Sequence, residues 1–426
     1  MHKQPVLVRN PDVVLICQVF YPDNQSTSQL FTDLLKGIDK NKVKTTVVSG
    51  FPSMPNGIIL KKKETIGAVE IRRSGLAIDY KKNLILRGFH YFCYLAGSTL
   101  ELWKLRKCSL IFGVTNPPFT PVWLWILSKI FLKRYQIMLL DIYPDGLVGV
   151  GKLKNGGLIT RLWRFANRKA FQSSERVIVL GRDMRELVES VYGVPRNRID
   201  YVPHWSVFQP PESTPAENTQ MIKKLKLETK FIIQYSGNMG LWHDIDSIVQ
   251  VADELKDHKD IHFLMIGDGM RQSRARQTAV RLGLGNMTWL PFQPKDSLSD
   301  SLSCCHLAMI SQRDGLKGVA VPCKLYGILA SGRGVLAMVP AGSEVDLVVR
   351  EEVCGRTVSP GDISGIVSAI LELKGNRSLV ASMGENAFRA YRQKYTLDSA
   401  INTFHRIWSK EGDKKRETDT HLNENI

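Results

Sequence analysis

The sequence predicts an α/β protein with two domains, each built around a doubly wound parallel sheet. The chain has 426 residues, which is more than one hydrophobic core usually organises. Short apolar runs typical of buried parallel strands alternate with helical patterns in both halves. Residues 206–222 are rich in Pro, Ser, Thr and Glu, a composition typical of a linker. Two Rossmann-like units joined by this linker are therefore expected.

The first half alternates strand and helix patterns. Its apolar runs predict strands at 13–20, 43–49, 68–73, 110–114, 136–142, 177–180 and 199–203. Helical patterns cover 30–38, 83–106, 118–134, 158–172 and 182–192. This order indicates βαβ units, whose strands run parallel in one sheet.

The second half repeats the pattern, with strands expected at 231–235, 261–266, 287–290, 306–310 and 334–339. The predicted domains are residues 1–205 and 225–395, with a linker at 206–224. A last helix at 396–409 is expected to pack back on the N-terminal domain. The polar tail, residues 410–426, has a composition typical of disorder.

The positive charge is concentrated in the first half. The net charge is +17, and residues 1–205 hold 31 Lys+Arg against 15 Asp+Glu, whereas the remaining residues hold 27 against 26. Such asymmetry suggests an anionic partner, either phospholipid headgroups or nucleic acid. A contribution to solubility alone is the other reading.

Several classes of protein are not expected. Residues 1–12 lack the apolar core of a secretory signal, and no run reaches the roughly 18 apolar residues of a membrane span. The seven Cys do not form pairs with metal-ligand spacing, so a zinc site is not expected. Free thiols fit a reducing compartment, and the expected location is cytoplasmic.

Two helical segments, 83–106 and 118–134, combine aromatic and basic residues. That mixture suits the membrane interface. It suits equally a core helix whose long basic side chains reach the solvent from its ends. Both interpretations stay open at this point.

The stretch 306–345 is the main candidate for a ligand site. A strand at 307–310 leads into a loop, and a helix is expected to open at Pro322, because proline suits a first helical position. A helix beginning just after a strand points N–H groups at one place, which suits a phosphate. Lys317 and Lys324 add positive charge there.

Two further turns after strands in the second half contain glycines, Gly237 to Gly240 and Gly267 to Gly269. Glycine lets backbone N–H groups approach a phosphate. The sequence has no GxxxxGK[ST] motif, and no GxGxxG with its acidic partner, so neither a P-loop nor a usual dinucleotide site is expected.

Polar residues also follow strands in the first half. Asp141 lies at the end of its strand, with Asp145 just beyond, and ligands bind outside the carboxyl ends of parallel strands. Gln25 and Ser26 lie after the first strand, where Ser26 either caps the next helix or faces a ligand. These residues are candidates for an acceptor side.

Four segments resemble family 4 glycosyltransferases of the GT-B type, and especially bacterial enzymes of colanic acid, O-antigen and capsule assembly (WbuB/WcaI-like). They are YSGNMGLWHDIDSIVQVADEL at 235–255, FLMIGDG at 263–269, GVAVPCKLYGILASGRGVLAMVPAGSEV at 318–345 and DIYPDGLVGVG at 141–151. The resemblance implies two Rossmann-like domains facing across a cleft. It implies a nucleotide-sugar in the C-terminal domain and an acceptor in the N-terminal domain.

The resemblance also assigns residues. Asp141 and His243 are its catalytic candidates. The donor-binding candidates are Gly237, Asn238, Gly240, Gly267, Asp268, Gly269, Lys317, Gly318, Val319, Lys324, Leu325, Ser343 and Glu344. Gln25, Ser26 and Asp145 are the acceptor-side candidates.

Four positions depart from the family pattern. Asn238 stands where an Arg is usual and His243 where a Lys is usual, although His243 can still donate to a phosphate oxygen. Val319 and Gly327 stand where two Glu are usual, the second of which positions the donor ribose. Glu344 and Asp268 are expected as substitutes.

The expected activity is that of a retaining, metal-independent hexosyltransferase without a cofactor. It moves a sugar from a UDP- or GDP-linked donor to a lipid-linked or polysaccharide acceptor. The expected partners are the donor, the acceptor and an anionic membrane surface, on the inner face of the cytoplasmic membrane. A non-catalytic GT-B partner protein and a basic nucleic-acid-binding protein are the alternatives.

Overall fold

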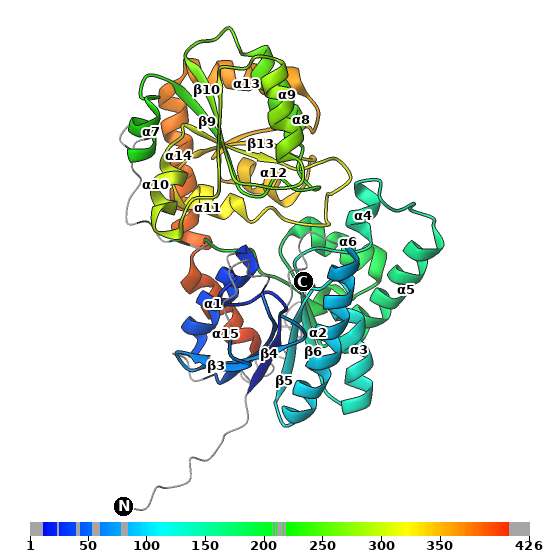
Figure 1. Cartoon of the computed structure of the whole chain (residues 1–426). Coiled ribbons are helices and arrows are strands. Elements are labelled where there is room, and N and C mark those ends of the chain that lie inside the picture. The colour runs from blue at the N-terminus through cyan, green and yellow to red at the C-terminus, as the bar shows by residue number, and fades with distance from the viewer. Residues whose placement is uncertain are drawn as a thin grey trace, which may run out of the picture.

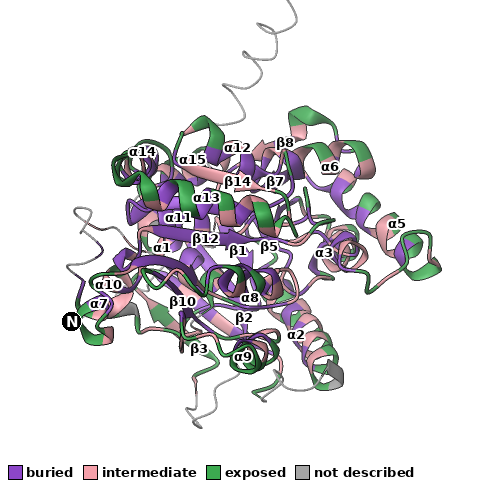
Figure 2. Ribbon diagram, turned by 90° about the horizontal axis from the view of Figure 1, so that it is seen from above, coloured by how far each residue is buried: buried purple, intermediate pink, exposed green. Residues whose placement is uncertain are grey.

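The computed structural model describes residues 12–408, except 24, 40–42, 53–59, 78–83, 207, 209, 211–215 and 217–218. Two sheets, each covered by helices on both faces, lie one above the other in Figure 1. Figure 2 shows buried strands between helices whose outer surfaces are exposed. The predicted tail, 410–426, lies outside the described residues.

The N-terminal sheet has the strand order β3-β4-β2-β1-β5-β6-β7-β8. All its pairs are parallel except β3 with β4. The strands are β1 (Val13–Ile16), β2 (Thr45–Gly50), β3 (Lys63–Ile66), β4 (Val69–Ser74), β5 (Leu110–Val114), β6 (Tyr135–Leu139), β7 (Arg176–Val179) and β8 (Ile199–Tyr201).

Helices cover both faces of this sheet (Figure 1). Helix α1 (Ser26–Asp39) packs against the last helix, α15 (Leu397–Trp408). The opposite face carries α2 (Leu84–Lys104), α3 (Thr120–Phe131), α5 (Leu158–Ser173) and α6 (Arg182–Tyr192), while α4 (Asp145–Gly149) is one short turn after β6.

The C-terminal sheet is parallel throughout, with the order β11-β10-β9-β12-β13-β14. Its strands are β9 (Phe231–Ser236), β10 (Ile261–Ile266), β11 (Met287–Leu290), β12 (Leu307–Ser311), β13 (Gly334–Met338) and β14 (Gly355–Val358). Its helices are α7 (Gln220–Leu225), α8 (Ile245–Glu254), α9 (Gln272–Arg281), α10 (Leu298–Ser303), α11 (Lys324–Ala330), α12 (Glu344–Glu351), α13 (Ile363–Gly375) and α14 (Arg377–Lys394).

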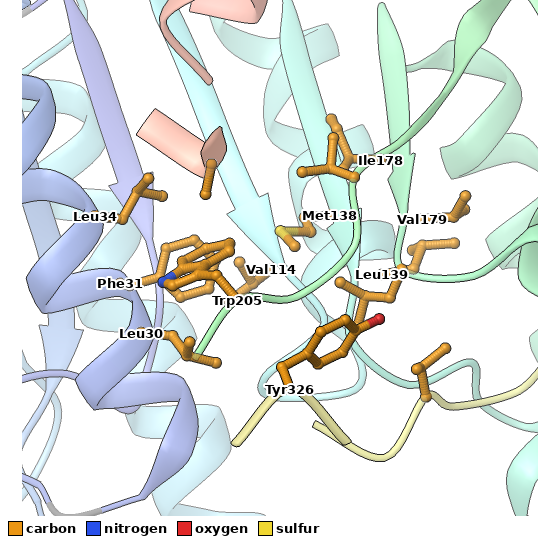
Figure 3. Packing of buried hydrophobic residues seen from close by; sticks show 14 of the residues in the cluster. Leu30, Phe31, Leu34, Val114, Met138, Leu139, Ile178, Val179, Trp205 and Tyr326 are labelled. Atoms are coloured by element: carbon orange, nitrogen blue, oxygen red, sulfur yellow. The ribbon is translucent and has the colours of Figure 1, made fainter. Parts of the chain in front are cut away.

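One buried cluster joins the two sheets. In Figure 3, Trp205, which follows β8, and Tyr326, which belongs to α11, lie among side chains of α1 and of β5, β6 and β7. Phe404 of α15 meets the ring of Phe112 on β5, with centroids 5.9 Å apart. Apolar burial on this scale is the main force that holds packed elements together, so the relative placement of the sheets rests on a shared core.

Some elements differ from the sequence prediction. Strand β3 is not among the predicted strands; its sequence KETI is polar, and it pairs at the sheet edge, where alternate side chains stay exposed. Strand β14, with sequence GRTV, carries no apolar run and was also missed. Helix α11 begins at Lys324 rather than Pro322, and its seven residues make it too short for a strong helix dipole.

Candidate functional site

Each sheet reverses its winding direction at one strand, and the two reversal points face each other. Strand β1 lies between β2 and β5, and β9 lies between β10 and β12. Ligands of doubly wound sheets bind outside the strand ends at such points. Here Ile142 N–H, after β6, donates to Val319 O at 2.9 Å, and Asp141 forms an isolated bridge with Ala320. The two carboxyl edges are therefore in direct contact.

Lys324 places its ammonium at this point. Among the described residues its Nζ has no hydrogen-bond partner, and it is inaccessible to solvent although the residue as a whole is partly exposed. The ammonium lies 3.6 Å from the centroid of the Tyr235 ring, a cation–π contact. Burial lowers the pKa of Lys324 to about 7. A buried charge without an acidic partner is costly, which makes this position a candidate site for an anion.

Only the first of the glycine turns faces Lys324. A Cβ placed on Gly237, whose φ is +129°, would lie 3.4 Å from Lys324 Nζ. A Cβ on Gly267 would instead lie 2.1 Å from Gly237 O, and one on Gly269 would lie 2.5 Å from Met239 C. Close packing between two turns thus accounts for Gly267 and Gly269, and Gly237 is the one directed at the cation.

His243 lies beside the same cation. Its Nδ1 is 2.9 Å from Ser311 O, so Nδ1 carries the proton that is donated to this carbonyl. Burial and the Lys324 charge lower the pKa of His243 to about 3. The neutral ring then presents Nε2 as an acceptor. Our expectation that His243 donates to a phosphate does not fit this tautomer, which suits a hydroxyl donor instead.

Asp141 faces the same region from the N-terminal domain. Its backbone N–H donates to Thr115 Oγ1 at 3.3 Å, which ties the ends of β5 and β6 together. Burial raises the pKa of Asp141 to about 6. Asp141 also acts electrostatically on Cys323, the residue before Lys324. A carboxylate with a pKa near neutrality can accept a proton from a hydroxyl group.

The start of α1 reaches the start of α11. The Ser26 hydroxyl hydrogen-bonds to Cys323; burial raises the pKa of this thiol, whereas Ser26 and Lys324 lower it. Gln25 is exposed and bonds through Nε2 to Asp23 Oδ2 at 3.3 Å. Ser26 therefore contacts the C-terminal domain, while Gln25 turns back onto its own loop. Sequence reasoning missed Cys323, because a single Cys carries no spacing signal.

Glu344 does not have the free carboxylate that a ribose ligand needs. It is 1% exposed, and its oxygens accept from Arg182 Nε at 3.1 Å and Tyr201 OH at 2.6 Å. Ser343 Oγ accepts from Asp346 N–H at 3.4 Å as a helix cap. The structure therefore argues against Glu344 as the ribose substitute. Arg182, its partner, could not have been found from sequence spacing.

The loop before α11 is held by the other domain. Gly318 N–H donates to Asp183 Oδ2 at 2.8 Å, and Lys317 is exposed, with its Nζ near Gly342. Val319 and Leu325 are 3% and 0% exposed. Their side chains are core residues, so only their backbone can contact a donor.

The carboxylate of Asp145 is bound by neighbouring side chains of its own domain. Its Oδ1 accepts from Arg164 Nη2 at 2.7 Å, and Oδ2 accepts from the Tyr192 hydroxyl. Both carboxylate oxygens of this buried residue are occupied, which argues against its predicted contact with an acceptor.

Three remaining candidates belong to the first two turns of the C-terminal domain. Asn238 and Asp268 are exposed; Asn238 O accepts from Tyr235 OH at 2.8 Å, and Asp268 Oδ1 accepts from Gly269 N–H at 2.7 Å. Gly240 is buried, and its carbonyl accepts from His243 N–H at 3.2 Å. Asn238 and Asp268 are thus open to solvent at these turns, whereas Gly240 supports the turn that carries His243.

A row of aromatic rings leads up to the site. Phe119, before α3, stacks on Trp163 of α5 with centroids 4.6 Å apart. Trp163 stacks at 6.0 Å on Tyr143, which meets Trp242 of the other domain at 5.8 Å. These residues lie far apart in the sequence, so the row could not be predicted.

In the part of the chain that the structure describes, no group of three or more His, Cys, Asp and Glu side chains is arranged to hold a metal ion. Within the same residues, no helix is long and apolar enough to cross a membrane.

Two comparisons concern the sequence. The family model for "Glycosyl transferases group 1" matches residues 217–390. The probable glycosyltransferase WbjE of Pseudomonas aeruginosa is 24% identical over 304 residues, covering 71% of this chain and 74% of the relative. The putative colanic acid biosynthesis glycosyl transferase WcaI of Escherichia coli K12 is 26% identical over 349 residues, covering 79% and 82%.

Solved structures share the fold. Sucrose-phosphate synthase from Thermosynechococcus elongatus superposes with a TM-score of 0.75 at 14% identity, over 97% of this chain and 100% of that one. WaaG, a glycosyltransferase involved in lipopolysaccharide biosynthesis, gives 0.69 at 13% identity over 93% and 100%. Anabaena HepE in complex with UDP-glucose gives 0.67 at 15% over 92% and 97%. The fold is GT-B, and residues 217–390 are similar to the group 1 glycosyltransferases.

Proposed function

We propose that the protein is a retaining glycosyltransferase that transfers a hexose from a UDP- or GDP-linked donor to a lipid-linked or polysaccharide acceptor in cell-surface glycan or capsule biosynthesis. The named relatives WbjE and WcaI support the glycan class. The HepE structure with UDP-glucose supports the donor class. No metal and no cofactor takes part in this proposal.

The observation that carries the proposal is the buried ammonium of Lys324, which has no hydrogen-bond partner among the described residues. Departure of a nucleoside diphosphate places negative charge on its phosphates, and a cation fixed there in advance stabilises that charge. Gly237 leaves room next to Lys324 Nζ for phosphate oxygens. Lys317 is exposed and adds charge at the rim.

The other site residues would contact the transferred sugar and the acceptor. His243 Nε2 accepts a hydrogen bond from a hydroxyl group of the transferred sugar, because Nδ1 is committed to Ser311 O. Asp141 accepts the proton of the attacking acceptor hydroxyl, and Ser26 lies on the same side. Both residues would then touch the reacting molecules from opposite domains.

A thermal-shift screen over UDP, GDP and common nucleotide-sugars tests the proposal. We expect at least one of them to raise the melting temperature, and Lys324→Ala to abolish the rise. Release of nucleoside diphosphate from the best ligand should then depend on an added lipid-linked acceptor. Equal shifts in the wild type and Lys324→Ala would remove Lys324 from the site.

One observation favours a second candidate, a non-catalytic GT-B partner protein. Val319 and Gly327 stand where the family has Glu, and Glu344 is bound by Arg182 and Tyr201. A chain without a ribose ligand fits a partner that has lost donor binding. If no nucleotide in the screen shifts the melting temperature, this candidate replaces the first.

A further inference from the structure

Large apolar side chains are exposed along one flank of the N-terminal domain. Most of those exposed in the described part of the chain lie on or beside α2, α3 and α5. These helices are neighbours on one face of the sheet (Figure 1), and Trp123 Nε1 of α3 donates to Thr99 Oγ1 of α2 at 3.2 Å. We call the outward surface of α2, α3 and α5 the helical flank.

On α2 the exposed apolar residues form one continuous stripe. Phe89, Phe92, Leu100 and Trp103 are 52%, 68%, 64% and 54% exposed. Their spacings of three, eight and three residues place them on the same side of a helix with 3.6 residues per turn. A helix of 21 residues with an exposed aromatic stripe has a second apolar surface beyond the one that packs on its own sheet.

The neighbouring helices continue this surface. Ile126 and Ile130 of α3 are 49% and 63% exposed and lie one turn apart. Leu158, Leu162 and Phe165 of α5 are 73%, 59% and 60% exposed, again at helical spacing. Three helices from separate βαβ units therefore present apolar side chains outward, which is more than isolated surface residues would do.

The stretch of chain that contains these three helices is strongly basic. Residues 84–173 contain 13 Lys and Arg against three Asp and Glu. Two of these cations lie over exposed rings of the helical flank: Arg106 lies 4.8 Å from the Trp103 centroid and Lys169 lies 5.6 Å from that of Phe165. Apolar and aromatic side chains framed by Lys and Arg are the composition that binds the interface of an anionic bilayer.

We propose that the helical flank inserts its apolar side chains into the headgroup region of a bilayer that contains anionic phospholipid. Charge complementarity selects this partner over a second copy of the chain, because a self-interface would bring two strongly basic surfaces together. The inference rests on the proposed function for its purpose, which is to bring the site to a lipid-borne acceptor.

The position of the flank fits that purpose. Near the start of α2, Arg87 and Tyr91 act electrostatically on Tyr143, two residues beyond Asp141. The aromatic row from Phe119 through Trp163 to Tyr143 connects the flank to the same place. A flank lying on the bilayer therefore holds the acceptor side of the site at the height of lipid headgroups.

Co-sedimentation with vesicles tests the proposal. The full chain should bind phosphatidylcholine vesicles containing 30% phosphatidylglycerol at low salt, and pure phosphatidylcholine at least about tenfold more weakly, because surface charge attracts basic segments. The triple variant Phe92→Ser, Leu100→Ser, Trp103→Ser should lose about tenfold or more in vesicle binding. The matched control Met270→Ser, Val280→Ser alters residues that are 85% and 74% exposed on the other domain, and should bind like the wild type.

Two further measurements separate the possible failures. Nucleotide thermal shifts of the triple variant should equal those of the wild type, which shows that its fold and donor site are intact. Unchanged vesicle binding by the triple variant would overturn the inference. The inference would also fail if the wild type did not bind vesicles but formed a dimer that the same three substitutions dissociate. Vesicle binding without any nucleotide shift would instead contradict the proposed function and leave the flank supported.

Discussion

At the scale of single residues, Lys324 combines a cost to stability with its proposed role in binding. Its ammonium is buried without a hydrogen-bond partner among the described residues, and burial lowers its pKa from the usual 10.5 to about 7. The folded state therefore disfavours the charged form. Lys324→Met should raise the melting temperature by a few degrees in the absence of ligand, since it removes an uncompensated charge.

The size of this effect depends on pH. Below pH 7 the folded Lys324 is protonated and the full cost is present, and the cost shrinks as the pH rises toward 10.5, where the unfolded residue also loses its proton. Thermal melts of both proteins from pH 6 to 10 should converge at high pH. A lower melting temperature for Lys324→Met at pH 6 would show that Lys324 is stabilised by a contact in the folded state.

A second prediction at this scale concerns Asp141 and the pH dependence of glycosyl transfer. With a pKa of about 6, it is ionised at pH 7 and loses its charge as the pH falls below 6. Transfer should therefore decline on the acid side with an inflection near pH 6, and Asp141→Asn should lower kcat by about 10²–10⁴-fold and abolish this inflection. A variant profile that keeps the inflection would assign it to another group.

At the scale of elements, the turn after β10 supports the turn after β9. Gly267→Ala places a methyl group 2.1 Å from Gly237 O at a φ of +129° and should cost about 1–3 kcal/mol of unfolding free energy. Gly285→Ala is the matched control, because its Cβ meets nothing within 4 Å. Urea unfolding of both variants measures the difference, and equal stabilities would contradict the packing account.

The same scale shows what the sequence could and could not predict. Apolar runs such as that of β12 identify most strands, because a parallel strand is buried on both faces. The polar edge strand β3 carries no such run. The sequence identified Lys324 by its place after a strand, but its contact with Tyr235 appears only in the folded chain. In the same way, only the folded chain brings Arg182 to the Glu344 carboxylate, which is then no longer free to bind a ligand.

At the scale of the whole molecule, the domains are joined by a polar contact as well as by their shared core. Arg182 Nη1 also contacts Glu351 at 2.6 Å, so one guanidinium bridges two carboxylates of α12. Arg182→Ala leaves Glu344 buried without its cation and should cost about 3–5 kcal/mol. Small-angle scattering should then show a larger radius of gyration, whereas an unchanged radius would assign the domain arrangement to the apolar core alone.

The central claim is that the Lys324 ammonium binds the diphosphate of the donor. Calorimetry at pH 7, in two buffers of different ionisation enthalpy, measures this most directly with the nucleotide-sugar that gives the largest thermal shift. The pKa of Lys324 in the ligand-free protein is about 7, so binding of the donor at pH 7 should take up about half a proton. The affinity should fall as the pH rises above 7, by up to about tenfold per pH unit. Lys324→Arg, which stays charged, should bind without proton uptake. Binding by the wild type with no proton uptake at pH 7 would contradict the claim.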